Sequence, residues 1–152
     1  MDKIEFKKYC NEEFKRRGFK KIRKNEWHYK GINNIDCILW IDFVWQSYEI
    51  NYFYFIDWKE DRFPEITDCD LVGAFILLSK DTIKGEKFMT SRINYLKYEL
   101  EEIEPYFNLE FEEHVMPVLE IGKERLKEEL ETYLYKWHKE SDIKAAMYKL
   151  EN

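Results

Sequence analysis

Asp68 and Asp70, on either side of Cys69, form the most enzyme-like group of residues in the chain. Two carboxylates one residue apart on a strand share a face, where they can hold a divalent ion or divide the roles of acid and base. A metal site usually needs a third or fourth ligand, and the sequence indicates none. We therefore favour a water-exposed cluster at a strand edge over a catalytic pair.

The three histidines, His28, His114 and His138, lie far apart and outside the spacings of zinc-binding motifs. Glu113 and His114 are a candidate carboxylate–imidazole pair, but adjacent residues on a helix point in different directions. His28 follows Trp27 on a predicted strand, where a packing role explains it. With five glycines in all, and no phosphate-binding loop or nucleophile motif, the sequence predicts no metal and no cofactor.

Positive charge gathers at the N-terminus of a chain whose net charge is −6. Residues 1–30 hold eleven Lys/Arg against five Asp/Glu, whereas residues 31–152 hold fourteen against twenty-six. The basic segment 15–24, with Phe19 and Trp27 nearby, could contact phosphates and stack a base. The acidic balance of the whole chain argues against nucleic-acid binding, and a solvated helix end explains the same residues.

Negative charge gathers in the C-terminal half, where twelve glutamates lie between Glu99 and Glu131 against three Lys/Arg. The surplus carboxylates must face water or a partner, because burying them unpaired is too costly. This surface is a candidate docking site for a basic protein partner, such as a nuclease toxin, and a solvated helix face is the alternative. The candidate partner-binding residues here are Glu112, Glu113, Glu120 and Glu124.

The stretch 36–58 contains two aromatic-rich runs with a period of two, broken at Gln46-Ser47, which predicts an antiparallel hairpin. One face is almost wholly apolar and should lie in the core. Its predicted core residues are Leu39, Ile41, Phe43, Ile50, Tyr52 and Tyr54. The other face is a candidate interface, unless the chain's own helices cover it. Its candidate partner-binding residues are Trp40, Asp42, Phe53 and Phe55.

The elements that position these residues change from strands to helices near residue 90. The predicted order is a helix over 2–17, a strand over 20–29, the hairpin over 36–58, a charged loop over 59–67, a strand (or a short helix) over 68–79 and a mobile loop over 80–90. Helices follow over 91–104, ending before Pro105, and over 110–138, with a break near Pro117 and Gly122. A last helix covers 142–150, capped by Ser141.

This order predicts an α+β fold, in which an N-terminal helix, an antiparallel meander of three to four strands and C-terminal helices pack on the sheet. A length of 152 residues fits one domain, 1–152. Cys10 and Cys37 fall on apolar faces and are expected to be buried thiols. No apolar run is long enough to cross a membrane, and the N-terminus lacks the apolar core of a signal peptide, so we expect a cytoplasmic protein.

Several packing and turn motifs resemble a bacterial family known as domain of unknown function 4304. They are the segments 17–20 (RGFK), 27–30 (WHYK), 37–43, 51–53, 104–107 (EPYF) and 145–148 (AAMY). The resemblance covers most of the chain, least clearly 59–92, and implies the α+β fold. It implies no catalytic residues. Families of this kind often accompany bacterial toxin systems, so the resemblance also suggests an immunity-type role.

The sequence therefore predicts a small cytoplasmic, non-enzymatic binding protein, immunity-like, that docks a protein partner through its acidic or aromatic surface. The alternative is an enzyme or a small-ligand-binding protein that uses the sheet face, with Asp68, Asp70 and His28 as its polar groups. A concave aromatic pocket with converging carboxylates would favour the alternative, and an acidic patch without a pocket would favour partner binding. The oligomeric state is not predicted.

Overall fold

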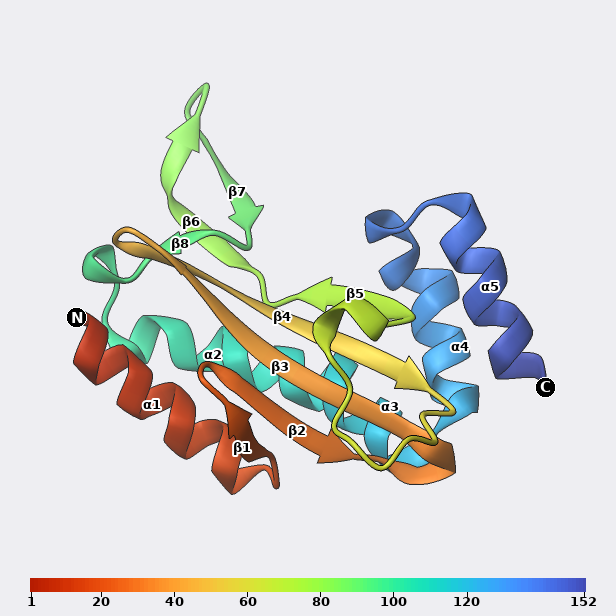
Figure 1. The fold of residues 1–152 in the computed structure, drawn as a ribbon. Coiled ribbons are helices and arrows are strands. Elements are labelled where there is room, and N and C mark those ends of the chain that lie inside the picture. Colours follow the sequence, from red (N-terminus) through yellow and green to blue (C-terminus); the bar gives the residue numbers. More distant parts are fainter.

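The computed structural model describes residues 1–152 and confirms an α+β fold with an antiparallel sheet (Figure 1). The main sheet has five strands in chain order, and a short sixth strand pairs with the fourth beside the fifth. All of its pairings are antiparallel. The strands are β1 (Lys20–Arg23), β2 (Glu26–Lys30), β3 (Ile35–Val44), β4 (Ser47–Ile56), β5 (Leu71–Ala74) and β8 (Ile93–Asn94). The meander is thus longer than the predicted three to four strands.

The hairpin of β3 and β4 is the centre of the sheet, with Leu39 opposite Tyr52 and Ile41 opposite Ile50. Of the six residues predicted for the core, all but Phe43 are at most 1% exposed. Phe43 lies near the hairpin end and is only half-buried, packing against the core cluster. Beyond it the chain turns at Trp45 (φ 57°), whose side chain is 93% exposed although it continues the apolar alternation. The core face therefore ends before the turn.

Helix α1 (Lys3–Arg16) packs on the inner face of the sheet, as predicted. Asp2 caps its first turn by accepting a hydrogen bond from the Glu5 N–H at 2.8 Å. Its buried residues, Phe6, Cys10 and Phe14, recur at the three-to-four-residue spacing of one helix face. The ring of Phe6 stacks on Tyr48 of β4 at 4.1 Å, and this contact fixes the helix against the sheet.

The C-terminal half covers the rest of the inner face (Figure 1). It consists of α2 (Leu100–Glu110), a π-helix (Phe111–Val115), α3 (Met116–Ile121), α4 (Lys123–Thr132), a 3-10 turn (Leu134–Trp137) and α5 (Glu140–Glu151). The prediction that a helix ends before Pro105 is wrong. Proline removes the N–H that would bond to the Glu101 carbonyl, but Glu101 is exposed and water can satisfy that oxygen. The predicted break is confirmed at Gly122, whose φ is +102°.

Other segments also differ from the predictions. The helix predicted over 91–104 begins only at Leu100, after β8 and a 3-10 turn (Tyr95–Lys97), and the last helix begins at Glu140 with Lys139 rather than Ser141 as its N-cap.

The segments 20–29 and 68–90 differ from the predictions as well. The chain over 20–29 is a hairpin rather than one strand, because Asn25 adopts a left-handed conformation (φ 61°) between β1 and β2. The chain over 68–79 bends after β5 instead of continuing as one strand. The predicted mobile loop is a two-stranded hairpin of β6 (Leu77–Ile83) and β7 (Glu86–Thr90) that projects from the body of the molecule (Figure 1).

No helix in the structure combines the length and the apolar composition needed to cross a bilayer. Cys10 and Cys37 are buried free thiols, as predicted. Their burial raises the pKa of each thiol well above its usual value.

Candidate partner-binding surface

The loop from Asp57 to Asp70 crosses one end of the outer face of the sheet (Figure 1). Arg23 holds this loop by donating to the carbonyls of Phe63 at 3.2 Å and Pro64 at 3.0 Å. Beneath it, Phe55 packs edge-on against Trp58 with ring centroids 6.2 Å apart, and only 1% of Phe55 is exposed. Phe55 was predicted to bind a partner, but its own loop buries it.

The other three candidate residues of the sheet face remain accessible. Trp40 and Phe53 are half-buried, with ring centroids 6.3 Å apart. Asp42 is half-buried and accepts a hydrogen bond from Arg92 at 3.1 Å, so its charge is already paired. We call Trp40 and Phe53 the aromatic window, because the loop leaves this pair open on the outer face.

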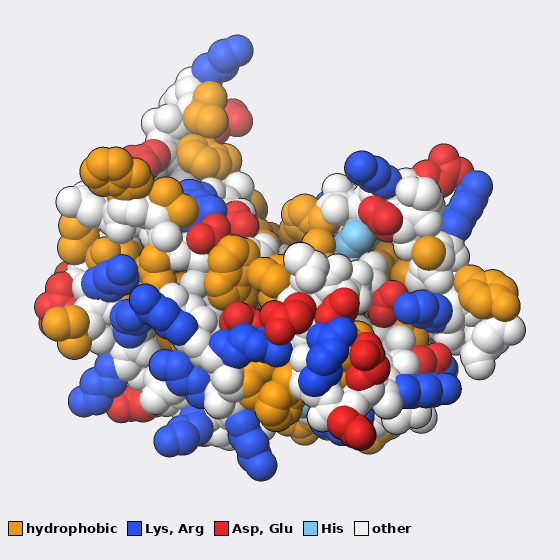
Figure 2. Space-filling model, in the orientation of Figure 1, with side chains coloured by type: hydrophobic (Ala, Val, Ile, Leu, Met, Phe, Trp, Pro, Cys, Tyr) orange, Lys and Arg blue, Asp and Glu red, His pale blue; other side chains and the backbone are white.

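A groove of about 240 Å³ lies beside the aromatic window. It is lined by Glu49, Asn51, Val72, Gly73, Ala74, Ser91 and Trp137, which we call the sheet groove. The strand register places Asn51 opposite Trp40 and Val72 opposite Phe53, so window and groove adjoin across β3, β4 and β5. Figure 2 shows this outer face, hollowed between the projecting hairpin and the C-terminal helices. The one carboxylate in the groove, Glu49, accepts a hydrogen bond from the Ser91 hydroxyl at 2.7 Å.

Strand β5 forms the floor of the sheet groove, and two contacts fix it there. One is the close approach of Gly73 to the ring of Tyr52, which leaves no room for a Cβ at position 73. At the free edge of β5, the N–H of Val72 donates to Nε2 of His138 at 2.8 Å, while Nδ1–H donates to the Leu134 carbonyl at 2.7 Å. His138 thereby occupies one donor of a strand edge that could otherwise pair with another chain.

The four glutamates predicted to bind a partner are all exposed on the C-terminal helices, and none forms an ion pair. Glu112 and Glu113 lie on the π-helix, Glu120 on α3 and Glu124 on α4. Nearby, Arg125 is engaged by Glu129 and Glu128, so it does not neutralise them. Their negative charge is open to solvent, and its use for binding stays a prediction.

The structure does not bring Asp68, Asp70 and His28 together. Asp68 ends a 3-10 turn, where its carboxylate accepts from the Glu65 N–H at 2.9 Å and from Arg62 at 3.2 Å. The first of these bonds, and then Arg62, lower the pKa of Asp68. Asp70 accepts from Lys149 and from the Ile56 N–H, both at 2.7 Å, and so ties α5 and β4 together. His28 pairs instead with a carboxylate on β3. The paired aspartates are therefore structural contacts and do not share a strand face.

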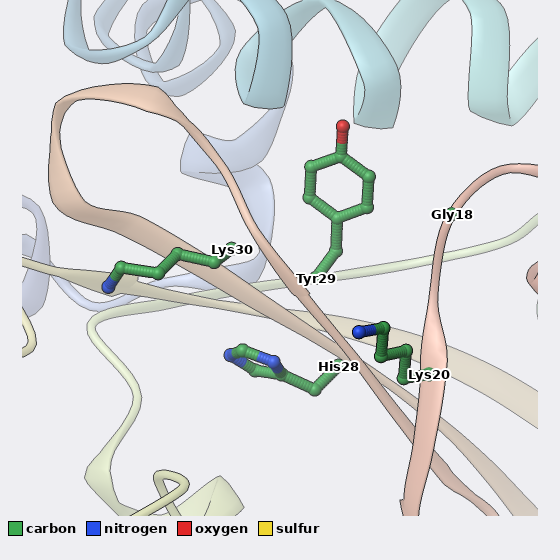
Figure 3. Close-up of a pocket in the computed structure, with 5 residues that line it drawn as sticks. All are labelled: Gly18, Lys20, His28, Tyr29 and Lys30. Carbon is green, nitrogen blue, oxygen red and sulfur yellow. The ribbon is translucent and has the colours of Figure 1, made fainter. Parts of the chain in front are cut away.

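That carboxylate, Asp36, is 3% exposed, and it bonds to Nε2 of His28 at 2.6 Å and to Nζ of Lys30 at 3.3 Å. His28 and Lys30 border a shallow hollow of about 480 Å³ (Figure 3). Its other lining residues are Gly18, Lys20 and Tyr29. Lys20 and His28 are partners in the β1–β2 register, and Tyr29 points to the opposite side of the strand from His28. Sequence reasoning noted the basic segment but not this hollow.

A buried polar cluster on the inner side also escaped prediction. Glu110, the last residue of α2, is 2% exposed and accepts hydrogen bonds from the hydroxyls of Tyr52 at 3.2 Å and Tyr133 at 3.3 Å. Burial raises the pKa of Glu110 to about 7, although the positive charge of His114 and the two tyrosine bonds act in the opposite direction. Tyr133 also packs edge-on against Trp137 with centroids 5.0 Å apart, so this cluster supports one wall of the sheet groove.

His114, four residues after Glu110, belongs to the same cluster. Its Nδ1 pairs with Glu129 at 2.9 Å, and its ring stacks on Tyr133 at 3.9 Å. Burial would lower the pKa of His114, but the bond to Glu129 and the charges of Glu129 and Glu110 raise it overall. The i, i+4 spacing of Glu110 and His114 was visible in the sequence, whereas their burial and the partner Glu129 were not.

Comparison of the chain with protein-family models, with curated proteins and with solved structures gave no match. The resemblance to domain of unknown function 4304 therefore stays a prediction, and the site must be interpreted from its own geometry.

Proposed function

We propose that the protein is a non-enzymatic binding protein that docks a protein partner on the outer face of its sheet. The observation that supports this most is the aromatic window, which the covering loop leaves open beside the sheet groove. Tryptophan and other aromatic side chains are the anchors that protein interfaces use most, because they contribute large contact area at a small cost in side-chain entropy. The window adjoins the sheet groove, a concave and partly apolar surface that is formed by residues of β4 and β5 together with Ser91 and Trp137.

The charge of the groove favours a particular class of partner. Glu49 is its only charged lining residue, and no cation lines it. The exposed glutamates of the C-terminal helices add negative charge elsewhere on the molecule. We therefore propose a basic partner with an apolar anchor, and an immunity-like mechanism in which the bound protein covers the partner's working surface. Exposed glutamates would then speed the encounter, while the window and groove hold the complex.

Site-specific photo-crosslinking tests this proposal. A benzophenone amino acid replaces Phe53 in one variant and Tyr148, which is 70% exposed on α5, in a matched control. Irradiation in the source cell should give a protein adduct for position 53 that the control does not give. The adduct, identified by mass spectrometry, should then bind the purified native protein. No specific adduct at position 53, or the same adducts at both positions, would contradict the proposal.

The alternative is an enzyme or small-ligand site on the same face, with Asp68, Asp70 and His28 as its polar groups. These three residues do not form one site, because each has a separate structural partner. The sheet groove offers one carboxylate rather than the converging pair that acid–base chemistry would use. A ligand-binding role for the groove therefore ranks below partner docking.

A further inference from the structure

The hollow at the β1–β2 edge differs from the other hollows of the surface in its charge. Its titratable lining residues are Lys20, His28, Tyr29 and Lys30, without a carboxylate (Figure 3). The hollows beside α1, at the sheet groove and below the projecting hairpin each contain at least one glutamate, and the one at the β3–β4 turn has no charged residue. Of these five hollows, this is the only one that is lined by lysines and has no carboxylate in its lining.

The positive charge of the hollow is only partly neutralised. Lys30 shares the buried carboxylate of Asp36 with His28, and Lys20 forms no ion pair. Lys20 and Lys30 are both exposed, so their ammonium groups can move onto a ligand without loss of core packing. His28 cannot, because Asp36 holds its Nε2 at 2.6 Å and only about a tenth of its side chain is exposed. The hollow therefore combines two exposed lysine side chains with a His28 ring held in place by Asp36. Such a combination is suited to binding a phosphate group.

The ring of Phe63 lies next to the His28 side chain. Phe63 packs edge-on against His28 with ring centroids 4.9 Å apart, yet it is 50% exposed. Its backbone is fixed, since Arg23 donates to the carbonyls of Phe63 and Pro64. A large exposed aromatic held next to a cationic hollow is the arrangement on which nucleobases stack while lysines contact the phosphate.

We propose that this hollow binds the phosphate group of a nucleotide, with Lys20 and Lys30 contacting the phosphate oxygens and Phe63 stacking on the base. The nucleotide is either free or part of a single strand, since both present the same chemistry. The site lies on the β1–β2 side of the outer face, away from the sheet groove. It is independent of the partner-docking proposal.

Titration of the isotope-labelled full chain, followed by NMR, tests the site with AMP, adenosine and inorganic phosphate as probes. AMP should shift the backbone resonances of Lys20, His28 and Lys30, and adenosine should bind far more weakly. In Lys20→Gln and Lys30→Gln, the loss of a charge-assisted hydrogen bond should weaken AMP binding about tenfold each. As controls, Lys87→Gln and Lys139→Gln each remove one charge from an exposed residue outside the hollow, and each should bind AMP as the native protein does.

Phe63→Ala separates the aromatic contact from the phosphate contact. It should weaken AMP binding about fivefold or more, as expected for the loss of one stacked base, and leave inorganic phosphate binding unchanged. A short adenosine oligonucleotide without terminal phosphates distinguishes the two sources: tighter binding than AMP identifies a strand, and weaker binding identifies a free nucleotide. The proposal is overturned if millimolar AMP leaves the three resonances unmoved, or if the Lys87→Gln and Lys139→Gln controls weaken binding as much as the hollow variants.

Discussion

On the inner face of β3 and β4, Leu39, Ile50 and Tyr52 are completely buried under helices, whereas on the outer face of the same two strands Trp40 and Phe53 stay half-buried. Alternation along one hairpin thus produces two aromatic faces with different surroundings. The inner face is covered by α1 and the C-terminal helices, and the outer face only by the loop 57–70 over one end. The difference indicates that the inner face stabilises the fold and the outer face is available for contact.

The largest effect on stability should follow from truncating a fully buried side chain of the inner face. Phe6 is fully buried against Tyr48, so Phe6→Ala should lower the free energy of unfolding by about 3–5 kcal/mol. Phe43 is only half-buried at the end of the same face, and Phe43→Ala should cost about 1–2 kcal/mol. Urea denaturation of both variants measures this. Equal losses would show that the core extends to the hairpin end.

The buried cluster of Glu110 and His114 should make the stability of the fold depend on pH. The pKa of Glu110 rises from 4.5 in the unfolded chain to about 7 in the fold, so the folded protein keeps this proton more tightly. Stability should be greatest below pH 4.5 as far as this group is concerned, and should fall by on the order of 3 kcal/mol as pH rises through 7. The raised pKa of His114 acts in the same direction. Glu110→Gln should flatten the pH dependence of urea midpoints, and an unchanged profile would contradict this assignment.

Substitutions in the aromatic window should have a small effect on stability and a large effect on partner binding. Trp40→Ala and Phe53→Ala should each lower the free energy of unfolding by only about 1–2 kcal/mol, because part of each side chain already contacts water. Each should weaken binding of the crosslinked partner about thirtyfold, as expected for the loss of an interface anchor. Calorimetric binding and urea melts on the same samples make the comparison. A large stability loss without a binding loss would assign the window to the core.

The smallest effect on stability should come from the exposed glutamates. Replacing Glu112, Glu113, Glu120 and Glu124 with glutamine should change the free energy of unfolding by about 0.5 kcal/mol or less, because none forms an ion pair. Association with a basic partner should slow, most clearly at low salt. Stopped-flow rates at two salt concentrations measure this, and rates that ignore both salt and substitution would contradict the steering role.

The fold was largely predictable, because the period of two over 36–58 and the helical period of the C-terminal half each report on local burial. The C-terminal helices begin at Leu100, however, and not near residue 90. Exceptions arose where one residue changed the backbone direction, as at Asn25, or where solvent tolerated an irregularity, as at Pro105. The site was less predictable. The burial of Phe55 depends on the path of the loop 57–70, and the bonds of Glu110 to Tyr52 and Tyr133 join segments distant in the chain, so no local pattern encodes either.

The most direct test of partner docking on the outer face of the sheet is the dissociation constant of the partner, measured for three proteins. These are the native chain, the double variant Trp40→Ala/Phe53→Ala and the four-glutamate variant. The account predicts that the double variant loses binding about a hundredfold or more, while its melting transition stays cooperative. The four-glutamate variant should weaken binding only through a slower association rate. Native affinity in the double variant would contradict the account, and would leave the acidic helices as the surface that binds.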